Sequence, residues 1–118
     1  NCFKRFSKEG DLQEVIHLPG ACVCRPVIHG DHLYAAVLRS PDLNAPGTGF
    51  VTILDKNNKV VSNIGGSEPQ YVGDKLQPMR QTDKIFVHPH DVCVDRDENL
   101  YVAQWASGKA YPYKLNRV

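Results

Sequence analysis

The chain has 118 residues, 42% of them hydrophobic, and its 14 basic and 13 acidic residues give a formal net charge of +1. This length and apolar content allow one modest core, and no apolar run approaches the roughly 18 residues of a membrane-spanning helix. With mixed charges, no basic stripe and no glycine-rich phosphate loop, the sequence argues against nucleic acid, nucleotides and the membrane as partners.

Residues 1–24 are expected to form an N-terminal arm or an edge strand. Within them, residues 7–18 are the nearest candidate for a helix, but the apolar positions 12, 15, 16 and 18 fit a helix and a strand about equally. The segment starts with Asn1 and has neither a methionine nor an apolar leader, which indicates a processed product, a trimmed chain or a fragment. The compartment is undecided, and export to the periplasm or the outside before processing stays open.

Residues 25–64 are predicted to form a first unit of strands. A short strand over 25–29 precedes a β-prone run over 31–40, and strands over 49–56 and 59–64 follow. Asn57 and Asn58 supply the turn between the last two strands, because asparagine tolerates a positive φ. Residues 65–84 are then a polar connection with paired glycines, long enough to be functional or mobile.

Residues 85–118 are predicted to form a second unit. It has a strand up to Asp95, an acidic turn over 95–99, a β-prone run from Leu100, and a third strand over 110–118, with no fourth. The acidic turn also resembles the start of a helix-flanked calcium loop. Because leucine follows Asn99 and the twelfth position is Ala106, a β-turn is favoured.

The two units repeat each other at a constant offset of 67 residues. Residues 31–40 match residues 98–107, and four pairs are identical: Leu33/Leu100, Tyr34/Tyr101, Ala36/Ala103 and Ser40/Ser107. A repeat of strand pairs is typical of an array such as a propeller rather than of a single sandwich. Two similar hairpins that arose by chance are the alternative.

The four cysteines do not form a recognisable disulfide or zinc pattern. Cys22 and Cys24 share one face of a short strand and are poorly placed to bond each other, and no second cysteine pair completes a zinc cage. Cys93 lies between two valines and is expected to be a buried free thiol. A bridge from Cys2 to one of the others stays open for a secreted protein.

The segment from Pro89 to Ala103 resembles an NHL repeat, whose pattern is a proline, a short apolar strand, an aspartate, an acidic-glycine turn and Leu-Tyr-Val-Ala. The resemblance covers 85–118 well and 25–64 more loosely. It departs from the family at Glu98, where glycine is usual, and at Gln104-Trp105, where an aspartate commonly follows the alanine. The resemblance implies an all-β chain with about two blades of a six-bladed β-propeller, the second blade incomplete.

A propeller of that size needs further blades, because an open stack leaves exposed strand edges. Either the chain is part of a longer propeller, or oligomerisation closes the ring. Three two-blade chains would give six blades, and residues 1–24 could then supply the missing strand. Self-association is therefore expected if the chain is complete.

Among such propellers, the motif from Pro89 to Val92 resembles one in the peptidyl-α-hydroxyglycine α-amidating lyases, which are zinc-dependent. The resemblance implies His90 as a zinc ligand, and Asp91 with the main-chain carbonyl of Val92 as ligands of a structural calcium. It also implies Arg39, which closes the 33–38 run, as a residue that contacts substrate. Those lyases need three such histidines and a tyrosine on several blades, and this chain shows one Pro-His motif. Three copies of the chain would bring three copies of His90 together.

The chemistry of such a site is clear in physical terms. Three histidines leave a fourth zinc position for substrate or water, zinc acts there as a Lewis acid, and an arginine holds a carboxylate by paired hydrogen bonds. Each residue also has an ordinary role, His90 as a hydrogen-bonded turn residue and Arg39 as a solvated charge. His88 points the same way as His90 in an alternating strand, but it is expected to be exposed and not a ligand.

Three functions therefore remain open. The favoured one is a propeller module that binds a small-molecule or peptide ligand, with or without a metal, at its central channel. The alternatives are a zinc-dependent lyase and a non-catalytic scaffold that contacts partner proteins through residues 65–82. Because one fold hosts many activities, the shape alone does not decide whether the chain is an enzyme.

Overall fold

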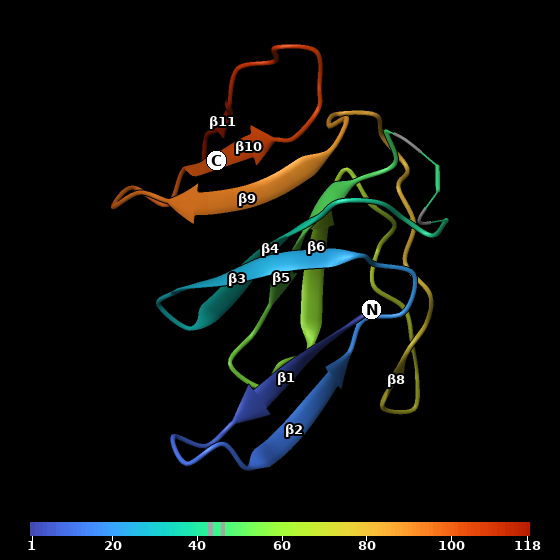
Figure 1. The fold of residues 1–118 in the computed structure, drawn as a ribbon, viewed down its shortest axis with the longest axis vertical. Coiled ribbons are helices and arrows are strands. Elements are labelled where there is room, and N and C mark those ends of the chain that lie inside the picture. Colours follow the sequence, from blue (N-terminus) through green and yellow to red (C-terminus); the bar gives the residue numbers. More distant parts are fainter. Residues whose placement is uncertain (43, 46) are drawn as a thin grey trace.

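The computed structural model describes residues 1–118 except 43 and 46. The described residues form an all-β fold of antiparallel sheets without a helix, which confirms the all-β part of the predicted fold class. In this part of the chain there is accordingly no helix that could cross a membrane. Figure 1 shows three layers: the hairpin of the first two strands, a central sheet, and the sheet that contains the C-terminal strands.

The strands follow one another as simple meanders, so that neighbours in sequence are neighbours in each sheet. The N-terminal hairpin consists of β1 (Cys2–Phe6) and β2 (Leu12–His17). The central sheet contains β3 (Val23–His29), β4 (His32–Val37), β5 (Phe50–Leu54) and β6 (Val60–Ile64). A small hairpin, β7 (Tyr71–Val72) and β8 (Lys75–Leu76), precedes the C-terminal sheet of β9 (Pro89–Val94), β10 (Leu100–Gln104) and β11 (Tyr113–Leu115).

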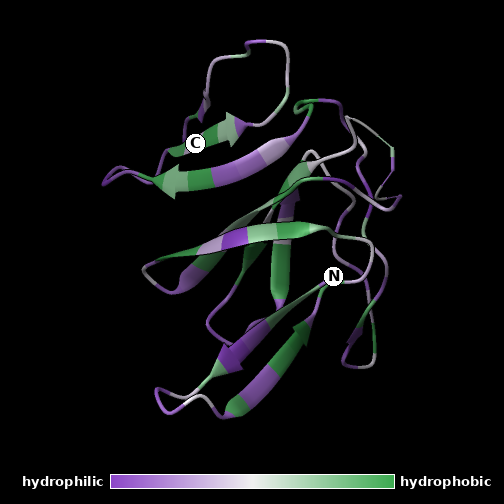
Figure 2. Ribbon diagram, in the orientation of Figure 1, coloured by the Kyte–Doolittle hydropathy of each residue, from purple (hydrophilic) through white to green (hydrophobic). Residues whose placement is uncertain are grey.

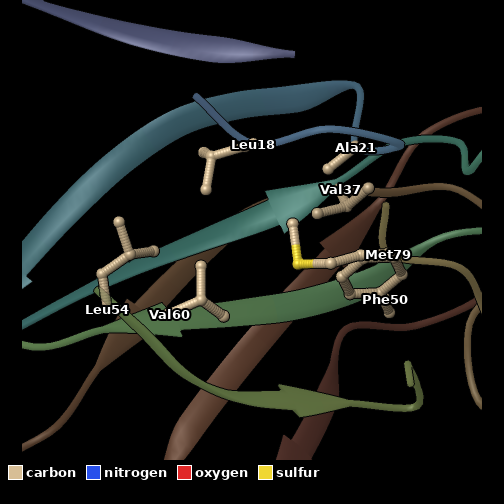
Figure 3. Packing of buried hydrophobic residues seen from close by; sticks show 7 residues of the cluster. All are labelled: Leu18, Ala21, Val37, Phe50, Leu54, Val60 and Met79. Atoms are coloured by element: carbon tan, nitrogen blue, oxygen red, sulfur yellow. The ribbon is translucent and has the colours of Figure 1, made fainter. Parts of the chain in front are cut away.

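The central sheet is covered on both faces, and its inner strands β4 and β5 are largely apolar and buried on both sides of the pleat. One face packs beneath the N-terminal hairpin in a cluster formed by Leu18, Ala21, Val37, Phe50, Leu54, Val60 and Met79 (Figure 3). The other face packs on the C-terminal sheet in a cluster formed by Val51, Phe86, Val92, Leu100 and Val102. Figure 2 shows hydrophobic stretches on these strands and mainly hydrophilic turns between them.

The connection over 65–84 is anchored to the central sheet at Met79, although many of its other residues are exposed. Met79 is buried in the first cluster, its N–H donates to the carbonyl of Pro19 at 2.9 Å, and its own carbonyl accepts from the Ser40 hydroxyl at 3.0 Å. Gly20 has a φ of +78°, and a Cβ there would lie 2.2 Å from the Met79 carbonyl oxygen. Only glycine fits at position 20, where the chain passes close to the Met79 backbone. This contact holds the connection against the segment that leads into β3.

Two turns of the same construction join β5 to β6 and β9 to β10. Asp55 Oδ1 accepts from the N–H groups of Asn57 and Lys59 at 2.8 and 3.0 Å. Asp95 Oδ1 accepts from the N–H groups of the equivalent residues, 97 and 99, both at 2.9 Å. The fourth residue of each turn has a positive φ, 60° at Asn58 and 62° at Glu98. The positive φ that was predicted for the first turn is confirmed, and the acidic stretch 95–99 is a β-turn.

These hydrogen bonds stabilise the ionised aspartates. The pKa of Asp55 lies below its ordinary value, chiefly because the Lys59 N–H donates to the carboxylate. The pKa of Asp95 is lowered too, chiefly by the side-chain amide of Asn99, which donates to Oδ2 at 3.0 Å. Each carboxylate therefore fixes its turn most firmly when it is charged.

The C-terminal sheet is covered on one face only, which overturns one prediction. Val92 and Val102 point to the central sheet, whereas Cys93 is on the opposite face and is exposed. The expectation that Cys93 is a buried thiol is wrong, because its two valine neighbours are buried by alternation and leave the residue between them outside.

Candidate functional site

Of the residues that the sequence analysis selected, His90, Asp91 and Val92 lie within β9, beside β3, and Arg39 follows β4. The start of β9 is closely packed, because a Cβ on Gly49 would come within 2.3 Å of the Pro89 ring and 2.4 Å of the Val37 carbonyl oxygen. Gly49, just before β5, therefore packs directly against Pro89, the first residue of β9. The side chains that follow Pro89 are held in a fixed position relative to the central sheet.

His90 and His88 both lie next to the ring of Trp105. The centroid of the Trp105 ring lies 6.3 Å from that of His90 and 6.5 Å from that of His88. His88 precedes β9, so the strand alternation behind the predicted shared direction does not extend to it. His90 is exposed, whereas His88 is only 7% exposed. The expectation that His88 is exposed is therefore wrong. It precedes β9, where the Gly47 N–H donates to its Nε2 at 3.3 Å and its carbonyl accepts from the Trp105 N–H at 2.9 Å.

Asp91 joins the two sheets through an ion pair that the sequence analysis did not predict. The Arg25 guanidinium donates from one nitrogen to both carboxylate oxygens, at 3.0 and 2.8 Å. Arg25 belongs to β3 and Asp91 to β9, so the pair links the first strands of successive sheets. Because the two residues are 66 positions apart, no local pattern could have revealed the contact. Both side chains are partly exposed, 67% and 40%, so the pair contributes at most about 1 kcal/mol.

Cys24 and Cys22 lie at the same end of the sheets, and all four cysteines are free. Burial raises the pKa of the Cys24 thiol, and the nearby Cys22 and Asp91 act in the same direction. The thiol form of Cys24 is therefore favoured, and this residue is a poor nucleophile at neutral pH.

Arg39 lies two residues beyond the end of β4, at the same end of the sheets as the first cysteines. Its carbonyl accepts from the Cys22 N–H at 3.0 Å, while the Leu38 N–H donates to the Cys22 carbonyl at 2.8 Å. The side chain is half-buried. Arg39 is thus near the strand starts that carry Arg25 and Asp91, and its role as a substrate contact stays a prediction.

The candidate metal ligands do not come together within the part of the chain that the structure describes. In the described part of the chain, no three histidine, cysteine, aspartate or glutamate side chains converge in a group that could hold one. Asp91 is engaged by Arg25 and by the Val92 N–H, which donates to its Oδ1 at 2.9 Å. A calcium ion at Asp91 and Val92 would have to displace the guanidinium. A zinc ion at His90 would need ligands from outside this chain's described residues.

Gln104 is a second residue that the sequence analysis missed. Its Oε1 accepts from the Val87 N–H at 2.7 Å, while its Nε2 is buried with no hydrogen-bond partner among the described residues. The same holds for His88 Nδ1. The sequence analysis noted Gln104 only as a departure from the NHL pattern that the segment resembles, and gave it no role. Two buried polar groups thus lie where β9 begins and β10 ends.

Comparison with models of known protein families, with curated proteins and with solved structures finds no match to this chain.

Proposed function

We propose that the chain contributes consecutive NHL-type blades to a β-propeller and that it binds a small-molecule or peptide ligand at the channel edge where β3 and β9 begin. One observation carries this proposal: equivalent residues of the repeat face the same way in successive layers. Leu33 packs toward the N-terminal hairpin, and Leu100 packs toward the central sheet. Each leucine therefore faces the layer that precedes its own.

The equivalent alanines of the repeat, Ala36 and Ala103, face the opposite way from the leucines. Ala36 pairs with Val51, a member of the cluster beneath the C-terminal sheet, so it faces the following layer and is fully buried. Ala103, its equivalent, faces away from the central sheet and is exposed. In a propeller every blade is followed by another, so this exposed face is where the next blade would lie.

The strand numbers fit the same arrangement. Propeller blades are four-stranded, and the central sheet is a four-stranded meander. The hairpin β1–β2 would then be the last two strands of the preceding blade, and β9–β11 the first three of the following one. Further blades are needed to close a ring, and either the rest of a longer propeller or other copies of the chain would supply them.

The ligand would meet the side chains that cluster at this edge. His90 is exposed beside Trp105, which is 56% exposed and offers an aromatic surface. Arg39 and the Arg25–Asp91 pair supply charge nearby. No described contact favours the zinc-dependent lyase, which rests on the resemblance alone.

Native mass spectrometry of the purified protein and of Ala103→Lys tests the proposal. We expect an assembly of several chains, and we expect the lysine variant to dissociate it because the charge would be buried against the next blade. The circular dichroism of the variant should stay unchanged. A wild-type protein that is folded and strictly monomeric would contradict the proposed closure. About one zinc per three chains would revive the lyase alternative.

A further inference from the structure

The strand β2 has an unpaired edge that borders a pocket. Four consecutive residues of β2, Glu14 to His17, line a pocket of about 740 Å³. Successive side chains of a strand point to opposite faces, so four in a row can line one space only if the strand presents its edge to it. Of β1, which occupies the other edge of β2, no residue lines the pocket. The edge that borders the pocket is therefore the one opposite β1.

The hydrogen-bond pattern of the hairpin shows which backbone groups face the pocket. The Leu18 N–H donates to the Asn1 carbonyl at 2.7 Å, and Ser7 N–H donates to the Asp11 carbonyl at 2.8 Å at the other end. Bonded and non-bonded pairs alternate along an antiparallel ladder. Ile16 and Glu14 consequently bond to β1, while the N–H and C=O groups of Val15 and His17 point outward. Within the described residues, no partner is found for these outward groups.

Two further segments of the chain line the pocket. The turn 57–59 forms one wall, and Asn58 is tied to β2 by a hydrogen bond from its Nδ2 to Glu14 Oε2 at 3.0 Å. The hairpin β7–β8 forms the other wall, where Asp74 pairs with Lys59 at 3.3 Å. Figure 1 shows β8 beside the N-terminal hairpin at the periphery of the molecule.

Val60, Tyr71 and Leu76 supply the apolar and aromatic part of the pocket lining, called the floor below, and the Lys59 Nζ lies 5.8 Å from the centroid of the Tyr71 ring. Val60 is buried, and Leu76 and Tyr71 are half-buried beside it. The Tyr71 hydroxyl donates to the Val60 carbonyl at 3.2 Å, which fixes the ring on the floor. An added strand would place every second side chain on this floor and the others in solvent. Natural proteins usually protect an open edge with lysine, proline or a bulge, and the stretch Glu14 to His17 has none of these.

We propose that this pocket binds an extended segment of a partner polypeptide, which pairs with the free edge of β2 at Val15 and His17. The segment has apolar side chains at alternate positions, and it adds a strand to the N-terminal hairpin by β-augmentation. The site is distinct from the edge where β3 and β9 begin, and it does not depend on closure of a propeller.

Amide hydrogen exchange, resolved by NMR, tests the proposal. In the free protein the Val15 and His17 amides should exchange much faster than the Ile16 amide, which bonds to β1. A defined library of acetylated and amidated hexapeptides with alternating apolar and polar residues is then added. We expect members of the library to slow exchange at Val15 and His17 at least tenfold and to leave Ile16 unchanged.

Two controls separate strand pairing from other binding. The same hexapeptides with N-methylated backbones should bind about tenfold more weakly, because a lost hydrogen bond costs roughly that factor. Val15→Pro should weaken binding similarly while Val15→Ala does not, and a protected Ile16 amide shows that the variant hairpin still forms.

Three results would overturn the proposal. The first is a Val15 amide in the free protein that exchanges as slowly as that of Ile16. The second is a library that leaves both amides unprotected or is insensitive to N-methylation. The third is protection that rises with protein concentration and molecular mass in the absence of peptide, which would assign the edge to a second copy of the chain.

Discussion

The central sheet and the C-terminal sheet are built from the same repeat, yet they differ in what covers them. The central sheet is covered on both faces, and alternate residues of β4 and β5 are buried toward each side. The C-terminal sheet is covered on one face, and its other face presents Cys93 and Ala103. The difference supports the proposal that a further layer covers the exposed face of the C-terminal sheet. The exposed face of the C-terminal sheet is therefore the surface on which the proposed arrangement can be tested.

The matched substitutions Ala36→Lys and Ala103→Lys should give the largest difference. Ala36 is fully buried between the sheets, so a lysine there would place an unpaired charge in the core and destabilise the fold by about 4 kcal/mol or more. In dilute, dissociated protein, Ala103→Lys should change the free energy of unfolding by no more than about 0.5 kcal/mol. Urea denaturation of both variants measures this. Equal losses would show that the outer face is already covered within one chain.

The turns at Asp55 in the central sheet and Asp95 in the C-terminal sheet should respond in the same way to low pH. In the folded chain the pKa values of Asp55 and Asp95 lie below the value of 3.8 in the unfolded chain. The ionised carboxylates therefore stabilise the fold fully above pH 3.8, and this contribution to the free energy of unfolding is lost as the pH falls through the pKa values of the folded chain. We expect Asp55→Ala and Asp95→Ala to lose stability at pH 7 and to converge on the wild type in strong acid. Thermal unfolding between pH 7 and pH 2 checks this, and a constant difference across the range would contradict it.

Substitution of the fourth residue of each turn should change the free energy of unfolding least. Asn58 and Glu98 have the same positive φ, and asparagine tolerates it better than glutamate. Glu98→Asn should therefore stabilise the chain by about 0.5 kcal/mol, even though the exposed ion pair of Glu98 with Arg117 is lost. The midpoint of urea unfolding reports the change, with Asn58→Glu as the reciprocal variant. A destabilised Glu98→Asn would mean that the ion pair matters more than the backbone.

The parts of the fold that follow from local sequence could be predicted. The turn at Asn57-Asn58, the acidic turn after Asp95 and the repeat of Leu-Tyr all carry their signals within a few residues. The hairpin β1–β2 was less clear, because a bulge between Arg5 and Phe6 breaks the alternation that would mark a strand pair.

The candidate site could be predicted only in part, because its contacts are long-range. His90 and Asp91 belong to a recognisable motif. The ion-pair partner of Asp91, Arg25, lies in another sheet, and the sequence around Arg25 gives no sign of this contact. The burial of His88 depends on Gly47 and Trp105, which reach it from different loops. The free edge of β2 is likewise invisible in sequence, since it depends on where the β7–β8 hairpin lies.

Met79 has a consequence for the order in which the chain can fold. It fills the cluster beneath the N-terminal hairpin, yet it follows all four strands of the central sheet in sequence. During synthesis, those strands emerge from the ribosome before the residue that completes their core. The cluster can close only after residues 65–78 have looped back, and contacts of such separation form slowly. Until then, the apolar face of the central sheet is open to chaperones and to other nascent chains.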